Sequence, residues 1–313
     1  MTTIIGHHHI SMLMKDAKTN NRFYSEVLGM RRVKKTVNQD SPFMYHLFYG
    51  DLTGSAGTEL SFFEMPMLAQ AVRGTNAITR IGLLVPSYES LHYWKRRFEQ
   101  FGVQHSDITA FAGRDAILFE DHEGLRLAII NNNGEPVPAH WQQWDGSSVV
   151  QEHRIMGMGT VEITVKNMQK LSSMLTEMFG YQVKAQDEQS AILQSAAGES
   201  FGEIIIVQQD GAVERPGKGS IHHLAIRVKD EQELRYWEQK VRERGYDTSG
   251  VIDRFYFQSL YFREGNGILF EIATDGPGFT IDSPVEDMGR SLDLPPFLEQ
   301  RRSEIEARLA PID

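Results

Sequence analysis

The stretch His8-His9-Ile10-Ser11-Met12-Leu13-Met14 opens a pattern that recurs along the chain. It has the alternation of a short strand and leads into an amphipathic helix that ends at Gly29. The same order of strand, helix and terminal glycine starts again at Thr79, Gly159 and His222. Each copy closes with a further strand that follows a glycine. The repeat predicts four βαβββ modules of about seventy residues each.

The four modules alternate between two kinds. From one position of the opening strand to the glycine that ends the helix, the first and third modules count 20 residues and the second and fourth count 22, for example His9 to Gly29 against His223 to Gly245. The pattern predicts an α+β protein with two tandem domains. The expected bounds are 1–133 for modules 1 and 2, 134–154 for a linker, 155–276 for modules 3 and 4, and 277–313 for a C-terminal arm with one short helix from Pro296 to Leu309.

Composition narrows the classes of protein to which this chain can belong. Its 313 residues include 32 basic and 42 acidic side chains, a formal net charge of −10. Nucleic acids and anionic membranes attract clustered Lys and Arg, so we expect neither as a partner. No apolar run approaches the roughly 20 residues that span a bilayer, and the N-terminus lacks a signal pattern. We expect a cytoplasmic protein that could form homo-oligomers. Cysteine is absent, so any metal must be held by His, Asp or Glu.

The repeat itself indicates where the chemistry lies. At one position of the opening strand the modules carry His9, Arg80, Thr160 and His223, and at one position of the last strand they carry Ser61, Ala128, Ile206 and Glu271. Only modules 1 and 4 supply histidine there, and only module 4 supplies a carboxylate. Two imidazoles and one carboxylate match the facial triad of non-haem Fe(II) enzymes, which leaves positions open for substrate and dioxygen. Manganese or zinc would fit the same donors.

This pattern resembles the vicinal oxygen chelate superfamily, in which two βαβββ modules form a cup around a divalent metal. The resemblance implies that module 1 closes a metal-binding cup with module 4, because only then can His9 meet His223 and Glu271. Modules 2 and 3 would form a second cup without a metal.

More narrowly, residues 8 to about 280 resemble ring-cleaving extradiol dioxygenases that act on hydroquinones. The similarity lies in His8-His9-Ile10-Ser11, in Tyr45-His46-Leu47-Phe48-Tyr49-Gly50-Asp51, in Ile221-His222-His223, and in the segment from Arg254 through Tyr261 to Glu271. It implies an enzyme that opens a small aromatic substrate, a hydroquinone or a catechol, with both atoms of O₂. The implied cofactor is Fe(II) on His9, His223 and Glu271, and the implied role is detoxification of quinone-type electrophiles.

The resemblance also assigns neighbours of the metal, namely His8, Ser11, His222, Arg254 and Tyr261. His222 or His8 would be the base that takes a phenolic proton, Arg254 a fixed cation and Tyr261 a donor to oxygen or substrate. Ser11 departs from the family, which has threonine at this place. The hydroxyl is kept, but its rotamer is less restricted. A hairpin around 265–267 would let Tyr261 and Glu271 face one cup.

Two other functions stay open on the sequence. A non-oxidative metalloenzyme, such as a glyoxalase-like isomerase or a thiol transferase, would need a second carboxylate, and Glu59 and Glu64 lie near Ser61. A metal-free binding module would bind no iron tightly. Histidines away from these equivalent positions of the repeat, such as His46, are expected in solvated surface positions.

Overall fold

A computed structural model describes residues 4–195 and 200–313 of the chain. All four predicted modules are present, and each has one strand, one helix and three further strands. Module 1 contains β1 (His7–Met14), α1 (Ala17–Arg22) with η1 (Phe23–Val27), β2 (Arg31–Asn38), β3 (Ser41–Gly50) and β4 (Glu59–Glu64). Module 2 contains β5 (Ala77–Val85), α2 (Tyr88–Phe101), β6 (His105–Phe111), β7 (Arg114–Glu120) and β8 (Arg126–Asn131).

The second half of the chain repeats this order. Module 3 contains β9 (Gly157–Val165), α3 (Met168–Ser173) with η3 (Met174–Met178), β10 (Gln182–Gln186), β11 (Ser190–Gln194), η4 (Ser200–Gly202) and β12 (Glu203–Gln208). Module 4 contains β13 (Ser220–Val228), α4 (Glu231–Glu243), β14 (Ile252–Asp253), β15 (Phe257–Arg263) and β16 (Leu269–Pro277). A single turn, η2 (Gln151–His153), lies in the predicted linker, and η5 (Phe279–Ile281), η6 (Val285–Asp287), α5 (Pro296–Glu299) and α6 (Arg302–Glu306) lie in the arm.

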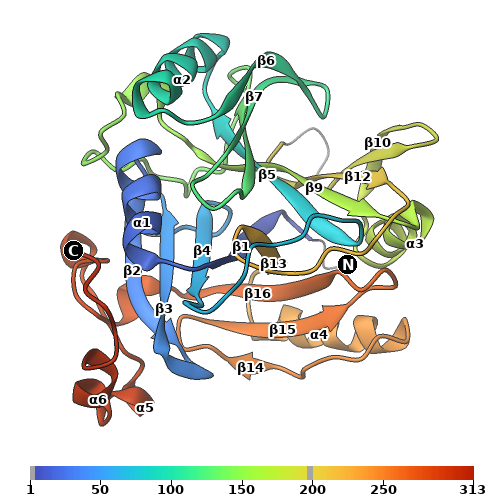
Figure 1. The fold of residues 1–313 in the computed structure, drawn as a ribbon. Helices are drawn as coiled ribbons and strands as arrows, with labels where there is room; N and C mark the ends of the chain where they lie inside the picture. The colour runs from blue at the N-terminus through green and yellow to red at the C-terminus, as the bar shows by residue number, and fades with distance from the viewer. Residues whose placement is uncertain (1–3, 196–199) are drawn as a thin grey trace.

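The strands form two eight-stranded sheets, and each sheet joins one module from each half of the chain (Figure 1). The first has the order β14-β15-β16-β13-β1-β4-β3-β2 and the second β10-β11-β12-β9-β5-β8-β7-β6. Modules 1 and 4 therefore share a sheet through the antiparallel pair β1–β13, and modules 2 and 3 share the other through β5–β9. The predicted α+β fold of four βαβββ modules is confirmed. The bounds 1–133, 134–154, 155–276 and 277–313 stay a prediction.

Both central strand pairs carry β-bulges at equivalent places. In the first sheet His8 and His9 together oppose one residue of β13, and His222 is an extra residue between the pairs Ser11↔His223 and Met12↔Ile221. In the second sheet, extra residues interrupt β5–β9 at the corresponding positions. A bulge changes the direction in which a side chain leaves the strand. The bulges are thus a property of the fold, and the histidine pairs occupy those of the first sheet.

The two kinds of module differ at the end of the helix. In modules 1 and 3 the last turn is wide, with a hydrogen bond from Leu28 N to Phe23 O in the first case. In modules 2 and 4 a longer α-helix continues instead. Gly29 and its three equivalents all follow the helix with positive φ, as the sequence predicts for a glycine at this position.

The C-terminal arm packs along β2 (Figure 1). The buried Lys34 on this strand bonds to the carboxylates of Asp282 and Asp293, each at 2.7 Å. The single helix predicted for the arm is wrong, because α5 and α6 are separate. Arg301 between them leaves the helical conformation, with φ −104° and ψ 8°, and its guanidinium lies 5.2 Å from the ring of Phe43.

Within the described residues, no helix is long and apolar enough to cross a membrane. The cytoplasmic location and homo-oligomer formation stay predictions.

Candidate metal centre and its cavity

His9, His223 and Glu271, which the comparison of the four modules singled out, meet at the centre of the first sheet. His9 Nε2 lies 3.3 Å from His223 Nε2, and Glu271 Oε2 lies 3.2 Å from the first and 2.7 Å from the second. The side chains come from β1, β13 and β16, and all three are buried. Pairing of β1 with β13, and of β13 with β16, brings them together.

This donor set fits a divalent metal. With bonds near 2.1 Å, ligand atoms on one octahedral face are about 3.0 Å apart, close to the separations here. Burial lowers the pKa of His223, which favours the neutral imidazole that a metal needs. Burial acts to raise the pKa of Glu271, but the adjoining His9 and His223 hold it well below its ordinary value. Apart from the two imidazole nitrogens, Oε2 of this carboxylate has no hydrogen-bond partner among the described residues.

His8 fixes the orientation of His9. Its Nε2 donates to the Thr274 carbonyl at 3.0 Å, and its Nδ1 lies 2.9 Å from His9 Nδ1. Nδ1 of His8 is therefore the acceptor, and His9 donates from Nδ1 and keeps Nε2 for a metal. Burial, then the neighbouring His9, lowers the pKa of His8 to about 3. His8 lies behind His9, with both of its nitrogens engaged.

His222 repeats this contact in module 4 but is open to the cavity. Its Nδ1 lies 2.7 Å from His223 Nδ1. If His223 binds a metal through Nε2, its Nδ1–H donates to His222, whose own hydrogen then sits on Nε2. Burial lowers the pKa of His222 to about 4, so the ring is neutral. His222 thus presents an N–H donor beside the triad.

The other oxygen of the triad carboxylate is held by a residue that sequence reasoning missed. The Ser259 hydroxyl donates to Glu271 Oε1 at 2.5 Å, and both side chains are buried. On the same strand, Tyr261 pairs directly with Glu271, and its ring is 5.6 Å from that of His223. The register of β15 with β16 could have pointed to Ser259, because it lies two residues from Tyr261 and so on the same face.

A cavity of about 550 Å³ opens over the triad. Of the residues assigned by resemblance, Ser11, His222, Arg254 and Tyr261 line it together with the three metal-site residues, whereas His8 does not. Ser11 shares a 2.6 Å hydrogen bond with Ser61. The Arg254 guanidinium lies 5.7 Å from the ring of Tyr261 and forms an ion pair with the exposed Asp40 at 3.1 Å.

The expected surface position is wrong for His46. Its side chain lines the cavity and stacks on Phe63, with 4.1 Å between the ring centroids. The reason is the register of β3 with β4, which pairs His46 with Phe63 on the concave face. The expectation of a solvated loop position suggested exposure, but the alternation along β3 places this residue inward.

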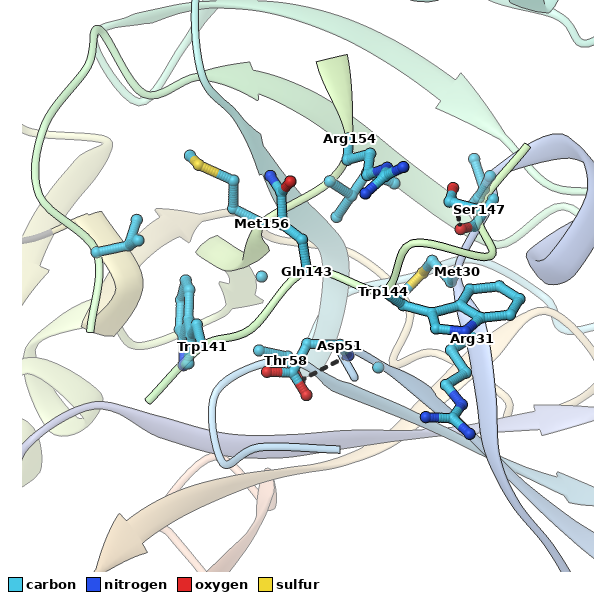
Figure 2. A pocket seen from close by; sticks show the side chains of 16 residues that line it. Met30, Arg31, Asp51, Thr58, Trp141, Gln143, Trp144, Ser147, Arg154 and Met156 are labelled. Carbon is cyan, nitrogen blue, oxygen red and sulfur yellow. Dashed lines mark hydrogen bonds between the residues drawn. The ribbon is translucent and has the colours of Figure 1, made fainter. Parts of the chain in front are cut away.

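A second pocket of about 220 Å³ is separate from the metal centre and shares none of its lining residues (Figure 2). Figure 2 shows Trp141 and Trp144 at its two ends. The Trp141 indole donates to the Ala56 carbonyl at 2.9 Å, and a methyl group at Gly57 or Gly157 would lie 2.7 or 2.5 Å from the indole ring. This pocket is a seam where the linker packs between modules 1 and 3.

The second sheet has no equivalent cluster among the described residues. The two groups of His, Asp and Glu side chains close enough to share a metal both contain His9, one with His223 and Glu271 and the other with His8 and Glu59. Glu59 belongs to the second group alone, so it is not aimed at the triad. Burial raises the pKa of Glu59 well above its ordinary value.

Comparison with known proteins gives consistent relatives. The sequence model of the Glyoxalase/Bleomycin resistance protein/Dioxygenase superfamily matches residues 6–129. The chain is 46% identical to a Bacillus subtilis (strain 168) protein named "Putative ring-cleaving dioxygenase MhqA", over 98% of each chain. It is 26% identical to the Chlorohydroquinone/hydroquinone 1,2-dioxygenase of Sphingobium indicum, over 96% of this chain and 94% of the relative.

Solved structures agree with this comparison. A crystal structure titled as a putative dioxygenase from Bacillus subtilis matches with a TM-score of 0.92 and 32% identity, over 100% of this chain and 99% of that one. Glyoxalase I from Zea mays matches with a TM-score of 0.64 and 11% identity, over 86% of this chain and 92% of that one. At this identity the likeness to glyoxalase I extends to the fold alone.

Proposed function

Because this chain belongs to the glyoxalase/bleomycin resistance protein/dioxygenase superfamily and aligns over nearly its whole length with ring-cleaving dioxygenases, we propose that it is an Fe(II)-dependent extradiol-type dioxygenase of hydroquinones or catechols. The observation that carries the proposal is the cluster of His9, His223 and Glu271 at the base of one cavity. A metal on this triad would supply open coordination positions at which a phenolate oxygen and dioxygen meet.

The residues of the chain prepare the site for this chemistry. Phe257 packs against His9, with 5.1 Å between the rings, and helps to form an apolar wall for an aromatic substrate. Arg254 brings a permanent positive charge to the cavity, where it can stabilise an oxyanion. Burial, then the charge of Glu271, raises the pKa of Tyr261, so its phenol stays protonated and can donate a hydrogen bond.

In this proposal His222 acts as a hydrogen-bond donor beside the metal. The hydrogen on Nε2 of its neutral ring can be shared with an oxygen there but is not given up, because loss of a proton from a neutral imidazole would leave an anion. His8 serves a different purpose, since its hydrogen bonds to His9 and Thr274 hold the ligand histidine in place. Ser11, through Ser61, helps to order the cavity wall.

The non-oxidative alternative has less support. Such an enzyme would complete its site with a second carboxylate, but Ser61 bonds to Ser11 and Glu59 groups with His8 and His9 rather than with the triad. No observation on the described residues favours this reading over ring cleavage.

Oxygen uptake tests the proposal. Protein loaded anaerobically with Fe(II) should consume one O₂ per ring when methylhydroquinone or catechol and air are added, and His9→Ala should lose the activity together with its bound iron. His92→Ala, at an exposed position on α2, is the matched control. Absence of uptake with every hydroquinone and catechol tried would refute the proposed function.

A further inference from the structure

Two buried polar atoms in one wall of the cavity lack hydrogen-bond partners among residues 4–195 and 200–313. They are Nε2 of His46 on β3 and Oγ1 of Thr36 on β2. The two residues are directly opposite one another in the antiparallel β2–β3 pair, so their side chains leave the sheet on the same face. A buried polar atom without a partner is costly. Two together in a cavity wall indicate a place for a polar group of a ligand.

Neighbouring rings hold this pair in position. The His46 ring stacks on Phe63 at an interplanar angle of 28° and also lies 4.1 Å from the ring of Phe48. The Thr36 hydroxyl lies beside the phenol of Tyr256. That phenol donates to Asp282 at 2.8 Å, so its oxygen can only accept from Thr36. A donation from Thr36 to Tyr256 leaves the acceptor capacity of the Thr36 oxygen unused, and Nε2 of His46 has no partner among the described residues.

The chemistry of the pair matches a hydroxyl group. Burial lowers the pKa of His46 well below its ordinary value, and the nearby His9 acts in the same direction. A neutral imidazole provides one donor and one acceptor, and a threonine hydroxyl can do either. A phenolic hydroxyl placed between them can donate to one and accept from the other, whereas an anion would find no fixed cation in the pair.

The position of the pair separates two substrate classes. Thr36 and His46 lie on β2 and β3 at one edge of the sheet, and β4 separates these strands from β1, β13 and β16, which carry the triad. Both groups line the same cavity, so they face it from different parts of its wall. Catechol carries adjacent hydroxyls, both of which would be directed toward the metal, so the opposite edge of its ring is bare carbon. A 1,4-dihydroxybenzene carries its second hydroxyl on that opposite edge.

We propose that Thr36 and His46 form a subsite for the second hydroxyl of a 1,4-dihydroxybenzene, which makes the enzyme selective for hydroquinones over catechols. The inference rests on the proposed function, because the first hydroxyl must be held at the triad. The sequence motif around His46 then has a role in substrate choice rather than in the metal site.

Anaerobic binding measures this selectivity without turnover. Hydroquinone, 4-methylphenol and catechol are titrated calorimetrically into Fe(II)-loaded protein. Wild type should bind hydroquinone about 10- to 100-fold more tightly than 4-methylphenol, the range expected when a buried polar group loses its partner. His46→Phe, which keeps the stack on Phe63, should remove this preference, and Thr36→Val should reduce it. Catechol affinity should stay within about twofold in both variants, a margin of about 0.4 kcal/mol.

His46→Gln and His92→Phe complete the design. His46→Gln retains a donor and an acceptor and should recover part of the preference for hydroquinone. His92→Phe changes an exposed histidine outside the cavity and should behave as wild type.

The inference is overturned if His46→Phe and Thr36→Val, folded and loaded with iron, keep the wild-type preference for hydroquinone over 4-methylphenol. It is also overturned if wild type has no such preference. In either case, oxygen uptake by wild type on a catechol or a hydroquinone would leave the proposed function standing. Absence of uptake on both would remove the proposed function itself.

Discussion

Replacing Ser259 with alanine removes the hydrogen bond that orients the carboxylate of the metal site. The Ser259 hydroxyl donates to Glu271 Oε1 at 2.5 Å, which leaves Oε2 facing His9 and His223. A hydrogen bond to a charged group contributes about 1.5–3 kcal/mol. The free energy lost corresponds to about a 10- to 100-fold weaker metal site, because the carboxylate must be reoriented each time a metal binds.

Competition with a chelator under anaerobic conditions gives the metal affinity directly. Ser259→Ala should raise the dissociation constant for Fe(II) by this factor, and its far-UV circular dichroism should match wild type. Ser172→Ala is the matched control, because Ser172 is buried in α3 of module 3, which belongs to the other sheet, and its hydroxyl has no hydrogen-bond partner in the described structure. Wild-type affinity in Ser259→Ala, or an equal loss in Ser172→Ala, would refute the reasoning.

Three further predictions concern stability. Burial raises the pKa of Asp121 from 3.8 to about 6, so the folded state holds this proton more tightly than the unfolded state. The stabilisation from this proton is therefore present below about pH 4 and lost as pH rises through about 6. Over this range the free energy of unfolding of wild type should fall by up to about 3 kcal/mol relative to that of Asp121→Asn, as measured by chemical unfolding. Lys34→Met leaves two arm carboxylates unpaired and should cost about 3–5 kcal/mol and expose the arm to limited proteolysis, whereas Lys35→Met should cost less than about 1 kcal/mol. Gly57→Ala, which meets the linker tryptophan, should lower the thermal midpoint more than Gly267→Ala, where an added methyl meets nothing within 4 Å.

Repetition made the cluster of His9, His223 and Glu271 predictable from the sequence. Each module starts with the same strand, so equivalent positions could be compared without an alignment of relatives. His9, His223 and Glu271 carry metal-binding side chains, whereas their equivalents in the other modules do not. Only a pairing of modules 1 and 4 can bring these three together, and the observed β1–β13 pair is that pairing. The repeat indicates position in the fold, because the core of each module fixes the register of its strands and so puts equivalent residues in equivalent places.

Residues that do not lie at the compared positions of the repeat were harder to place. Ser259 is one of many serines, and its importance depends on a 2.5 Å contact with Glu271 across a strand pair. His46 has no repeat-equivalent histidine to mark it, and its inward direction follows from a register that only the folded β3–β4 pair reveals. The break between α5 and α6 likewise depends on contacts with β2 and β3 that the local sequence does not contain.

The second sheet separates what the fold provides from what the side chains provide. It has the same bulges at the same positions as the first, so strand geometry alone does not make a metal site. A buried carboxylate is present there as well, since Glu203 accepts from Thr160 at 2.6 Å. Its other oxygen is 3.0 Å from Lys184 Nζ. Glu203 lies three residues before Ile206, the equivalent of Glu271, so it does not occupy the position of the triad carboxylate. The fold supplies two similar sheets, and the side chains at the equivalent positions decide which of them offers donors for a metal: His9, His223 and Glu271 in the first, against Thr160, Arg80 and Ala128 in the second.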